Sequence, residues 1–241
     1  MTRPDTDSDP QSPAPVLRGI SSMATRLVLA ELAQAHALRS GVRVDFESVG
    51  GVDAAKRVAA GEAFDVVVLA SDAIAKLEAG GHLLPGSSLP LTRSGVAVAV
   101  PEGAPLPDLS SLDTLRAALL AAPSIGYSTG PSGTQLLKLF EQWGLSEALA
   151  GRLLQAPAGV PVGSLVARGE VALGFQQLSE LIHQPGIRIA DGLPAEAQIN
   201  TVFSGAVCRT ATDPAAAQAL LAFMHSAEAS PAKRRQGMDP A

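Results

Sequence analysis

An α/β fold built from parallel βαβ units is predicted from three observations. Short apolar stretches alternate along the chain with segments whose apolar residues recur at helical spacing. One apolar stretch, residues 64–71 (FDVVVLAS), is continuous, which is typical of a strand buried on both faces. With 46% hydrophobic and only 17% charged residues among 241, the chain can form one large globular domain or two smaller lobes.

The first half of the chain alternates regularly between strands and helices. Two of the helical segments end at Gly41 and Gly61, as expected where a helix stops. The predicted strands are 15–21, 42–51, 64–71 and 94–101, and the predicted helices are 22–41, 52–63 and 72–83. This order predicts strands that run parallel and are joined by helices.

The second half repeats the pattern. Residues 133–144 (GTQLLKLFEQWG) place their large apolar side chains on one side of a helix. The predicted strands are 124–128, 171–177 and 200–208, and the predicted helical segments are 114–122, 133–144, 162–170, 178–186 and, as one helix or a pair, 214–237. The basic run Lys233, Arg234, Arg235 is interpreted as a solvated helix end that complements the helix dipole.

The composition excludes several classes of function. A net charge of −5 and a pI near 5.4 do not favour nucleic-acid binding, which needs a basic face. Aromatic residues make up only 3%, so stacking platforms for bases or sugars are not expected. The single cysteine, Cys208, allows no internal disulfide and no cysteine-based metal cluster, and the four histidines are scattered. We therefore expect no cofactor and no metal site, since no metal-binding, nucleotide-binding or nucleophile motif occurs.

The N-terminal residues 1–15 are polar, acidic and rich in proline, and are interpreted as a disordered tail. They contain no apolar core of a secretory signal, which predicts a cytoplasmic protein, or a periplasmic one if a leader was removed. No window of about 20 apolar residues predicts a membrane span.

A turn of small donors precedes the helix that starts near residue 133. The segment YSTGPSG (127–133) holds Ser128, Thr129, Ser132 and Gly133 directly after a predicted strand. Such residues cap helices and form turns. Alternatively, bare backbone N–H groups and hydroxyls at a helix N-terminus form a seat for an anion.

The order of five segments resembles the periplasmic molybdate-binding protein family. They are GISSMATRLVLAELAQ (19–34), ESVGGVDAAKRVAAGEAFDVVVLASDAIAKLEAGG (47–81), YSTGPSGTQLLKLFEQWGL (127–145), LVARGEVALGFQQLSEL (165–181) and FMHSAEASPAKRRQGMDP (223–240). Each segment alone is moderately specific for this family, and the order and spacing of the five segments together are strong evidence for the resemblance. The resemblance covers residues 16–240.

The resemblance implies a type II periplasmic-binding-protein fold with two α/β lobes and a ligand cleft between them. Lobe 1 would comprise residues 16–95 and 203–241, and lobe 2 residues 96–202, joined by two strand crossovers. The cleft is expected where the carboxyl ends of strands meet the N-termini of helices. In this family the lobes close on the ligand by a hinge motion.

The resemblance and the chemistry of the residues select the same turns as the ligand site. The hydroxyls of Ser21 and Ser22 and the backbone of Met23 follow the first predicted strand, although a plain N-cap is the alternative interpretation. Gly50 and Gly51 offer bare backbone where the family often has a hydroxyl. Ser71 starts a later helix and is a ligand candidate or a cap, and Ser128, Thr129, Ser132 and Gly133 supply the second lobe's part.

Two departures from the family pattern predict weak molybdate binding. Gln177, preceded by Gln176, stands where molybdate binders commonly have a tyrosine, and Gly51 lacks a hydroxyl. A glutamine both donates and accepts, which suits a carboxylate or hydroxyl better than a bare tetrahedral oxyanion. The alternative for both glutamines is a place on an edge strand at the surface. Arg93 could grip a carboxylate with two hydrogen bonds or be a surface residue at a strand start.

Two functions remain open. The first is a solute-binding domain that closes on a small anion, either a carboxylate or an oxyanion, with a small anionic ligand as partner and a transporter partner in doubt. The alternative follows from a similarity to aconitate isomerase, which moves a double bond in an unsaturated tricarboxylate. Tyr127, the only tyrosine, would then serve as acid or base, or else be a hydrogen-bonded aromatic residue at a strand end.

Overall fold

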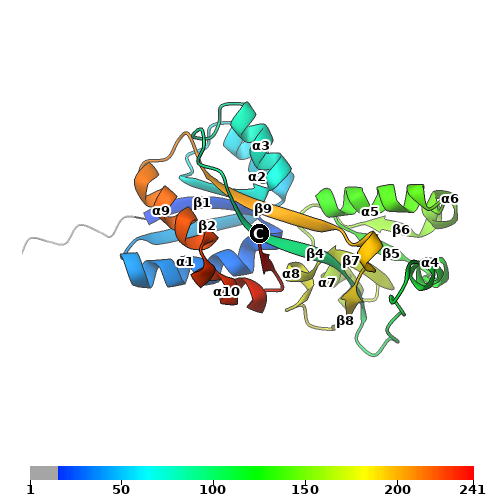
Figure 1. Ribbon diagram of the computed structural model, residues 1–241. Helices are drawn as coiled ribbons and strands as arrows, with labels where there is room; N and C mark the ends of the chain where they lie inside the picture. Colours follow the sequence, from blue (N-terminus) through cyan, green and yellow to red (C-terminus); the bar gives the residue numbers. More distant parts are fainter. Residues whose placement is uncertain (1–15) are drawn as a thin grey trace, which may run out of the picture.

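The computed structural model describes residues 16–241, and the predicted disordered tail of residues 1–15 lies outside the described residues. Two α/β lobes lie side by side and are joined by long strands (Figure 1). The strands follow one path in the order β2-β1-β3-β9-β4-β7-β5-β6, with β8 and β10 pairing with β4 off this path. The predicted α/β class is confirmed.

The first lobe contains three parallel strands, each followed by a helix. The strands are β1 (Val16–Ser22), β2 (Arg43–Val49) and β3 (Val66–Ala70). The helices are η1 (Met23–Thr25), α1 (Arg26–Ser40), α2 (Gly51–Ala59) and α3 (Ser71–Ala79). All five residues of β3 are buried, which confirms the prediction that this strand is covered on both faces.

The alternating side chains of β3 explain this double cover. Val66 and Val68 belong to one apolar cluster, which α1 and the C-terminal helices cover. Val67 and Leu69 belong to another cluster on the opposite face, which α2 and α3 cover. A strand that is buried on both faces needs apolar residues at every position, and the run VVVLA supplies them.

The second lobe repeats this arrangement around β5 (Ile125–Tyr127), β6 (Leu153–Gln155) and β7 (Leu173–Gln177), which are parallel. Its helices are α4 (Leu112–Ala121), α5 (Pro131–Gln142), α6 (Ser146–Leu149), η2 (Ala150–Arg152), α7 (Val162–Ala167) and α8 (Leu178–Leu181). The strand β8 (Ile187–Gly192) and the turn η3 (Ala195–Ala197) lead back to the first lobe.

Two antiparallel strands connect the lobes, β4 (Leu89–Pro101) and β9 (Asn200–Val207) (Figure 1). The first part of β4 pairs with β9, and its second part pairs with β7 and β8 of the second lobe. After β9 the chain forms α9 (Pro214–His225), η4 (Ala227–Ala229), α10 (Ser230–Arg235) and β10 (Asp239–Pro240) on the first lobe.

The buried apolar residues form two clusters in each lobe. The clusters of the first lobe draw on residues 17–91 and 203–238, and those of the second lobe on residues 96–199. This distribution supports lobe boundaries near 95 and 203, which stay a prediction as limits of independent domains.

The structure differs from the sequence predictions in several places: β6, β8, β10 and α6 were not predicted, and two further differences concern β4 and Lys233. The connecting strand β4 begins at Leu89 rather than at residue 94, because Leu89–Gly95 pair with β9 before the strand enters the second lobe. Lys233 is only 1% exposed, although the basic run was expected to be solvated. Burial lowers the pKa of its ammonium group, and Nζ has no hydrogen-bond partner among the described residues.

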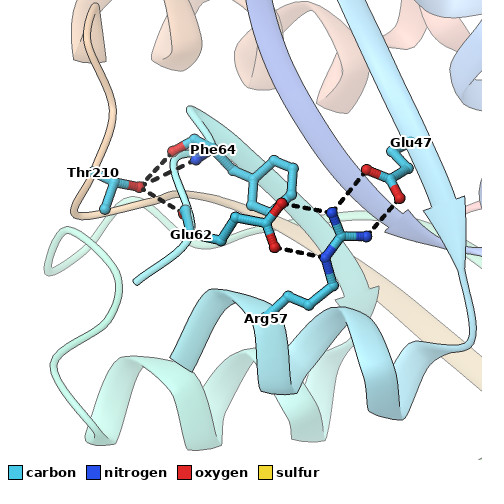
Figure 2. Close-up of polar contacts among 5 residues, drawn as sticks. All are labelled: Glu47, Arg57, Glu62, Phe64 and Thr210. Carbon is cyan, nitrogen blue, oxygen red and sulfur yellow. Dashed lines mark hydrogen bonds and ion pairs between the residues drawn. The ribbon is translucent and has the colours of Figure 1, made fainter. Parts of the chain in front are cut away.

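Arg57 fixes the C-terminal part of α2 (Figure 2). Its guanidinium donates to both carboxylate oxygens of Glu62 at 2.6 and 2.7 Å, and to both of Glu47 on β2 at 2.5 and 2.9 Å. The Arg57 guanidinium also lies 5.3 Å from the ring centroid of Phe64, and the Thr210 hydroxyl donates to the Phe64 carbonyl at 2.8 Å. The hydrogen bonds from Arg57 hold the pKa of both carboxyls below their usual range. This network fixes α2, whose other end points toward the second lobe.

A buried carboxylate joins the beginnings of β1 and β3 to the loop after β9. Asp65 is 4% exposed and accepts from the backbone N–H of Arg18 at 2.8 Å. Its other oxygen accepts from the backbone N–H and the hydroxyl of Thr212 at 2.7 and 2.9 Å. One side chain therefore supplies the hydrogen-bond acceptors for donors from segments that are distant in sequence, and so connects three segments of the fold.

We expect Asp65→Ala to lower the free energy of unfolding by about 2–4 kcal/mol, because it leaves three donors without an acceptor. Urea denaturation followed by circular dichroism measures this change. Asp113→Ala is the control, since that side chain is 95% exposed and should alter stability by less than about 0.5 kcal/mol. Equal stabilities for the two variants would contradict the role of Asp65.

Candidate functional site: a cleft where helix N-termini converge

A cavity of about 540 Å³ lies between the lobes and is lined by residues of both. The first lobe contributes the turn after β1 and the facing parts of α2 and α3. The second lobe contributes the turn before α5, the loop before α7 and the junction of β7 and α8. Thr201 and Phe203 of the connecting strand β9 complete the lining.

Six helical segments point their N-termini at this cavity. In the first lobe η1, α2 and α3 follow β1, β2 and β3, and in the second lobe α5, α7 and α8 follow β5, β6 and β7. Each N-terminus carries backbone N–H groups without an acceptor inside its helix. Together they make the cavity a region of positive potential even without cationic side chains.

Within residues 16–241, none of these six N-termini is capped by the side chain of its own N-cap residue, although Gln176 Oε1 accepts from Gly163 N in the first turn of α7. Two helices that lie away from the cavity, α4 and α9, differ in this respect, whereas α1, α6 and α10 are uncapped as well. Ser111 forms a capping box with Thr114 at α4, and Asp213 accepts from Ala216 N at α9. Apart from Gly163 N, the donors that a side chain satisfies at α4 and α9 are therefore left for another acceptor at the cavity.

Ser22 holds the clearest unsatisfied group on the first lobe. It is 8% exposed and lines the cavity, and its Oγ has no hydrogen-bond partner among the described residues. The hydroxyl of Thr25 donates to the Ser22 carbonyl at 3.0 Å and so fixes the turn. Met23 and Ala24 also line the cavity. Since buried hydroxyls are normally paired, Ser22 Oγ is available to a ligand.

Gly50 and Gly51 bring bare backbone to the same region. Both line the cavity at the start of α2. A Cβ added to Gly51 would lie 3.6 Å from Cβ of Ser22, so the two positions are neighbours. The small residues therefore leave the α2 N-terminus accessible next to the Ser22 hydroxyl.

The turn before α5 supplies the hydroxyls of the second lobe. Ser128, Thr129 and Ser132 line the cavity, and the hydroxyls of Ser128 and Ser132 lie 3.3 Å apart. Gly133 is buried behind them and does not line the cavity. A Cβ at Gly133 would lie 1.9 Å from the Ser128 carbonyl oxygen, so only glycine allows the turn to pack so closely against the helix.

The two glutamines at the end of β7 are buried and line the cavity, rather than lying on an exposed edge. Gln177 donates to the Thr201 hydroxyl at 2.7 Å, and its Oε1 has no partner in the part of the chain that the structure describes. Because the hydroxyl can either donate or accept, rotating the Gln177 amide by a half-turn exchanges the group that faces the cavity. Gln177 can therefore offer a ligand either an acceptor or a donor.

Glu180 is a cavity residue that the sequence analysis did not select. Its carboxylate accepts from Gln176 Nε2 at 2.9 Å, and Gln176 in turn accepts from Gly163 N of α7 at 3.2 Å. Burial raises the pKa of Glu180 to about 7, against the lowering effect of the Gln176 hydrogen bond. A carboxylic acid that gains and loses its proton near neutral pH is suited to proton transfer. In the sequence, the signal that could have identified Glu180 was an acidic residue four positions after Gln176, which itself lies at the end of a buried strand.

Four of the selected side chains do not reach the cavity. Ser21 is fully buried and its Oγ pairs with Ser48 Oγ at 2.8 Å. Ser71 pairs with Ser204 Oγ at 2.8 Å and donates to the Val202 carbonyl at 3.0 Å, which ties α3 to β9. Arg93 is exposed and lies 3.9 Å from Asp239 of β10.

The fourth is Tyr127, the proposed acid or base of the sequence analysis. It is absent from the cavity lining, and its ring packs against the apolar cluster of the second lobe and against Gly133. The strand alternation sends its side chain away from the cleft, while the following serine and threonine turn toward it. Of the two titratable groups, Glu180 is the one in contact with the cavity.

Comparison with known proteins places the chain in a family. The family model described as bacterial extracellular solute-binding protein matches residues 17–239. The chain belongs to this family of solute-binding proteins.

Individual relatives agree with this assignment. The aconitate isomerase of a Pseudomonas species is 38% identical over 234 residues, which cover 95% of this chain and 89% of that protein. The periplasmic molybdate-binding protein of Azotobacter vinelandii has a TM-score of 0.75 at 22% identity, covering 92% of this solute-binding protein and 98% of that chain. The sulfate-binding protein SubI of Mycobacterium tuberculosis H37Rv has a TM-score of 0.75 at 17% identity, and the match covers 94% of this chain and 87% of that chain.

These likenesses confirm the predicted two-lobed periplasmic-binding-protein fold and the resemblance to molybdate-binding proteins at the level of the fold. Within residues 16–241, no group of three or more His, Cys, Asp or Glu side chains could hold a metal ion. None of the helices there combines the length and the apolar character that crossing a membrane requires.

Glu180 makes a testable contribution to the pH dependence of stability. Its pKa is about 7 in the folded protein and about 4.5 when unfolded, so between these values only the folded state binds the proton. The stabilising contribution is complete below pH 4.5 and is lost as the pH rises through 7. Gln does not titrate, so the wild type loses this contribution and Glu180→Gln does not. We expect the free energy of unfolding of Glu180→Gln, measured relative to that of the wild type, to rise by about 1–3 kcal/mol from pH 5 to pH 8.

Urea titrations of both proteins across this range measure the effect. Glu147→Gln, an exposed glutamate of α6, is the matched control and should follow the wild type. A constant difference between Glu180→Gln and the wild type at all pH values would contradict the shifted pKa.

Proposed function

We propose that the cleft binds a small organic anion through a carboxylate group. The observation that carries this proposal is the buried Ser22 Oγ, which has no hydrogen-bond partner within residues 16–241 and lies beside the uncapped N-termini of η1 and α2. Ser128, Thr129 and Ser132 face it from the other lobe. A carboxylate accepts several hydrogen bonds at once and is stabilised by the positive ends of helices.

The polar groups at β7 favour a carboxylate over molybdate. Gln177 can turn an unpartnered acceptor toward the cavity, and a hydroxyl or protonated carboxyl group of an organic anion can donate to it, whereas fully ionised molybdate has no donor. The sulfate- and molybdate-binding proteins of this fold therefore indicate an anion site, while the lining residues favour an organic anion.

Ligand binding would close the cleft. Contacts from both lobes to one ligand favour the closed arrangement over the open one, and β4 and β9 are the connections about which the lobes would rotate. A transporter partner and a cytoplasmic or periplasmic location stay predictions.

Propane-1,2,3-tricarboxylate should bind more tightly than molybdate in isothermal titration calorimetry. Ser22→Ala should weaken its binding by about 1–3 kcal/mol, because a charged ligand then lacks one hydrogen bond. Ser146→Ala is the control, since this serine is exposed and lies outside the cavity lining. Submicromolar affinity for molybdate, or equal affinities of the two variants, would contradict the proposal.

A second candidate function is the isomerisation of an unsaturated tricarboxylate. Two observations favour it: the 38% identity to an aconitate isomerase and the position of Glu180. The ionised Glu180 carboxylate would take a proton from the carbon next to the double bond, and the C–H electron pair would shift across the three-carbon unit. A proton returned by the Glu180 carboxyl to its far end completes the reaction with no net gain or loss of atoms or electrons.

The pKa of Glu180 suits both halves of this step. A group with a pKa of about 7 is ionised and protonated in comparable amounts near neutral pH, which is the optimum for an acid–base catalyst. Gln176 holds the carboxyl through its hydrogen bond and is itself held by α7. Glu180 therefore takes the role for which Tyr127 was first considered.

Proton NMR of cis-aconitate and trans-aconitate incubated with the protein tests this second function. We expect interconversion with the wild type, a rate about 10²–10⁴-fold lower for Glu180→Gln, and a far smaller change for Tyr127→Phe. Propane-1,2,3-tricarboxylate binding checks that Glu180→Gln keeps a working cleft. If both isomers stay unchanged with the wild type, the protein binds carboxylates without isomerising aconitate; a selective loss in Tyr127→Phe would return the role to the tyrosine.

A further inference from the structure

We propose that the faces of α2 and α3 that border the cavity bind a second carboxylate of the ligand, so that the protein selects extended polycarboxylates over single-headed anions. This inference rests on the proposed carboxylate binding and adds a region to it that lies outside the turns described above. The region is called the α2–α3 groove and is defined by the lining residues Ala55, Lys56, Ala59, Ala73, Lys76, Leu77 and His82.

The lining residues of these helices follow helical spacing. On α2, Val52, Ala55, Lys56 and Ala59 are separated by three, four and seven positions, so they share one face. On α3, Asp72, Ala73, Lys76 and Leu77 form a corresponding face. The cavity thus continues from the N-termini of α2 and α3 along the length of both helices.

Small apolar side chains form the middle of the α2–α3 groove. Ala55, Ala59 and Ala73 occupy little volume, and Leu77 is buried beneath them. These positions offer no side-chain hydrogen-bonding group, so a hydrocarbon segment of a ligand can cross them without leaving a polar partner unsatisfied. A second anionic group would need to lie beyond them.

The cationic side chains of the cavity lie in this groove. Lys56 and Lys76 are the only lysines or arginines among the lining residues, so the region around Ser22, Ser128 and Gln177 contains neither. Both lysines are exposed, and neither forms an ion pair or side-chain hydrogen bond with another residue of the 16–241 range. Asp72, one turn before Lys76, also lines the cavity, but no ion pair joins the two. Both ammonium groups are therefore available to an anion.

The adjacent residue Arg57 differs from Lys56, because its donors are already taken up by other residues of the protein. Arg57 is not among the residues that line the cavity, and Glu47 and Glu62 take up its donors (Figure 2). The consecutive pair Lys56–Arg57 therefore serves two purposes: the arginine fixes the helix to the sheet, and the lysine faces the cavity.

The spacing fits a ligand with two separated carboxylates. Lys56 lies five residues after Gly51, and Lys76 five residues after Ser71, which places each Cα about 7.5 Å along its helix from the N-terminus. A carboxylate held at the N-termini and a second one on a short carbon chain can bridge this distance with the help of the flexible lysine side chains. A tetrahedral oxyanion held at the N-termini has no second anionic group to place beside the lysines.

Calorimetry with propane-1,2,3-tricarboxylate and with butanoate, which has the same propane unit but a single carboxylate, tests the groove. For the double variant Lys56→Gln/Lys76→Gln we expect about 5- to 30-fold weaker binding of the tricarboxylate and less than about twofold change for butanoate. The dependence of tricarboxylate affinity on salt should also become shallower, because two charges are removed.

The control is Lys138→Gln, an exposed lysine of α5 outside the cavity, which should leave tricarboxylate affinity within about twofold of the wild type. Lys56→Arg/Lys76→Arg should retain most of the affinity, because the charge remains. Circular dichroism verifies that each variant is folded.

The possible failures are distinguishable. If the wild type binds the tricarboxylate and the double variant binds it equally well, the α2–α3 groove is not a carboxylate site, while the proposed function stands. If the wild type binds no carboxylate at all, the proposed function fails and the groove inference fails with it. An equal loss for butanoate and the tricarboxylate would show that the lysines act on the first carboxylate, which also overturns the inference.

Discussion

The direction of the parallel strands is the constraint on which the cleft depends. In each lobe three parallel strands end toward the same cavity, and each is followed by a helical segment that starts there. Antiparallel pairing of β4 with both β9 and β7 joins the two sets, and the cavity lining shows that they face one another. Six helix N-termini therefore meet because of topology, and the positive potential at the cavity needs no cationic side chain.

This origin of the potential explains the residue types at the site. A seat made of backbone N–H groups requires small residues that let a ligand approach, and the chain places Gly50, Gly51 and several serines there. An N-cap side chain commonly stabilises a helix by about 1 kcal/mol, so leaving these N-termini uncapped costs stability in the unliganded protein. Networks away from the cleft, such as those of Arg57 and Asp65, stabilise the lobe that carries them.

Most strands and helices were predictable because their patterns are local, whereas the short β6, β8 and β10 were not predicted. The continuous run in β3, the alternation of elements and the donor-rich turn before α5 all found their expected places. Side-chain direction was not predictable, since it depends on partners far away in sequence: Ser71 is taken up by Ser204, whereas Ser22 finds no partner. Glu180 and Lys233 show the same limit, because a shifted pKa arises from burial that only the packed lobes create.

The charges that line the cavity connect binding to proton uptake. Lys56 and Lys76 contribute two positive charges and Asp72 one negative charge, so apart from His82 the lining side chains carry a net charge of +1 when Glu180 is protonated and of zero when it is ionised. An anion in the cleft therefore favours the protonated form of Glu180, and protonation of Glu180 favours the anion by the same factor. Acid–base chemistry needs the opposite form at its start, since only ionised Glu180 can accept a proton. A group with a pKa of about 7 can adopt both forms near neutral pH, so carboxylate binding and proton transfer are compatible in one cleft.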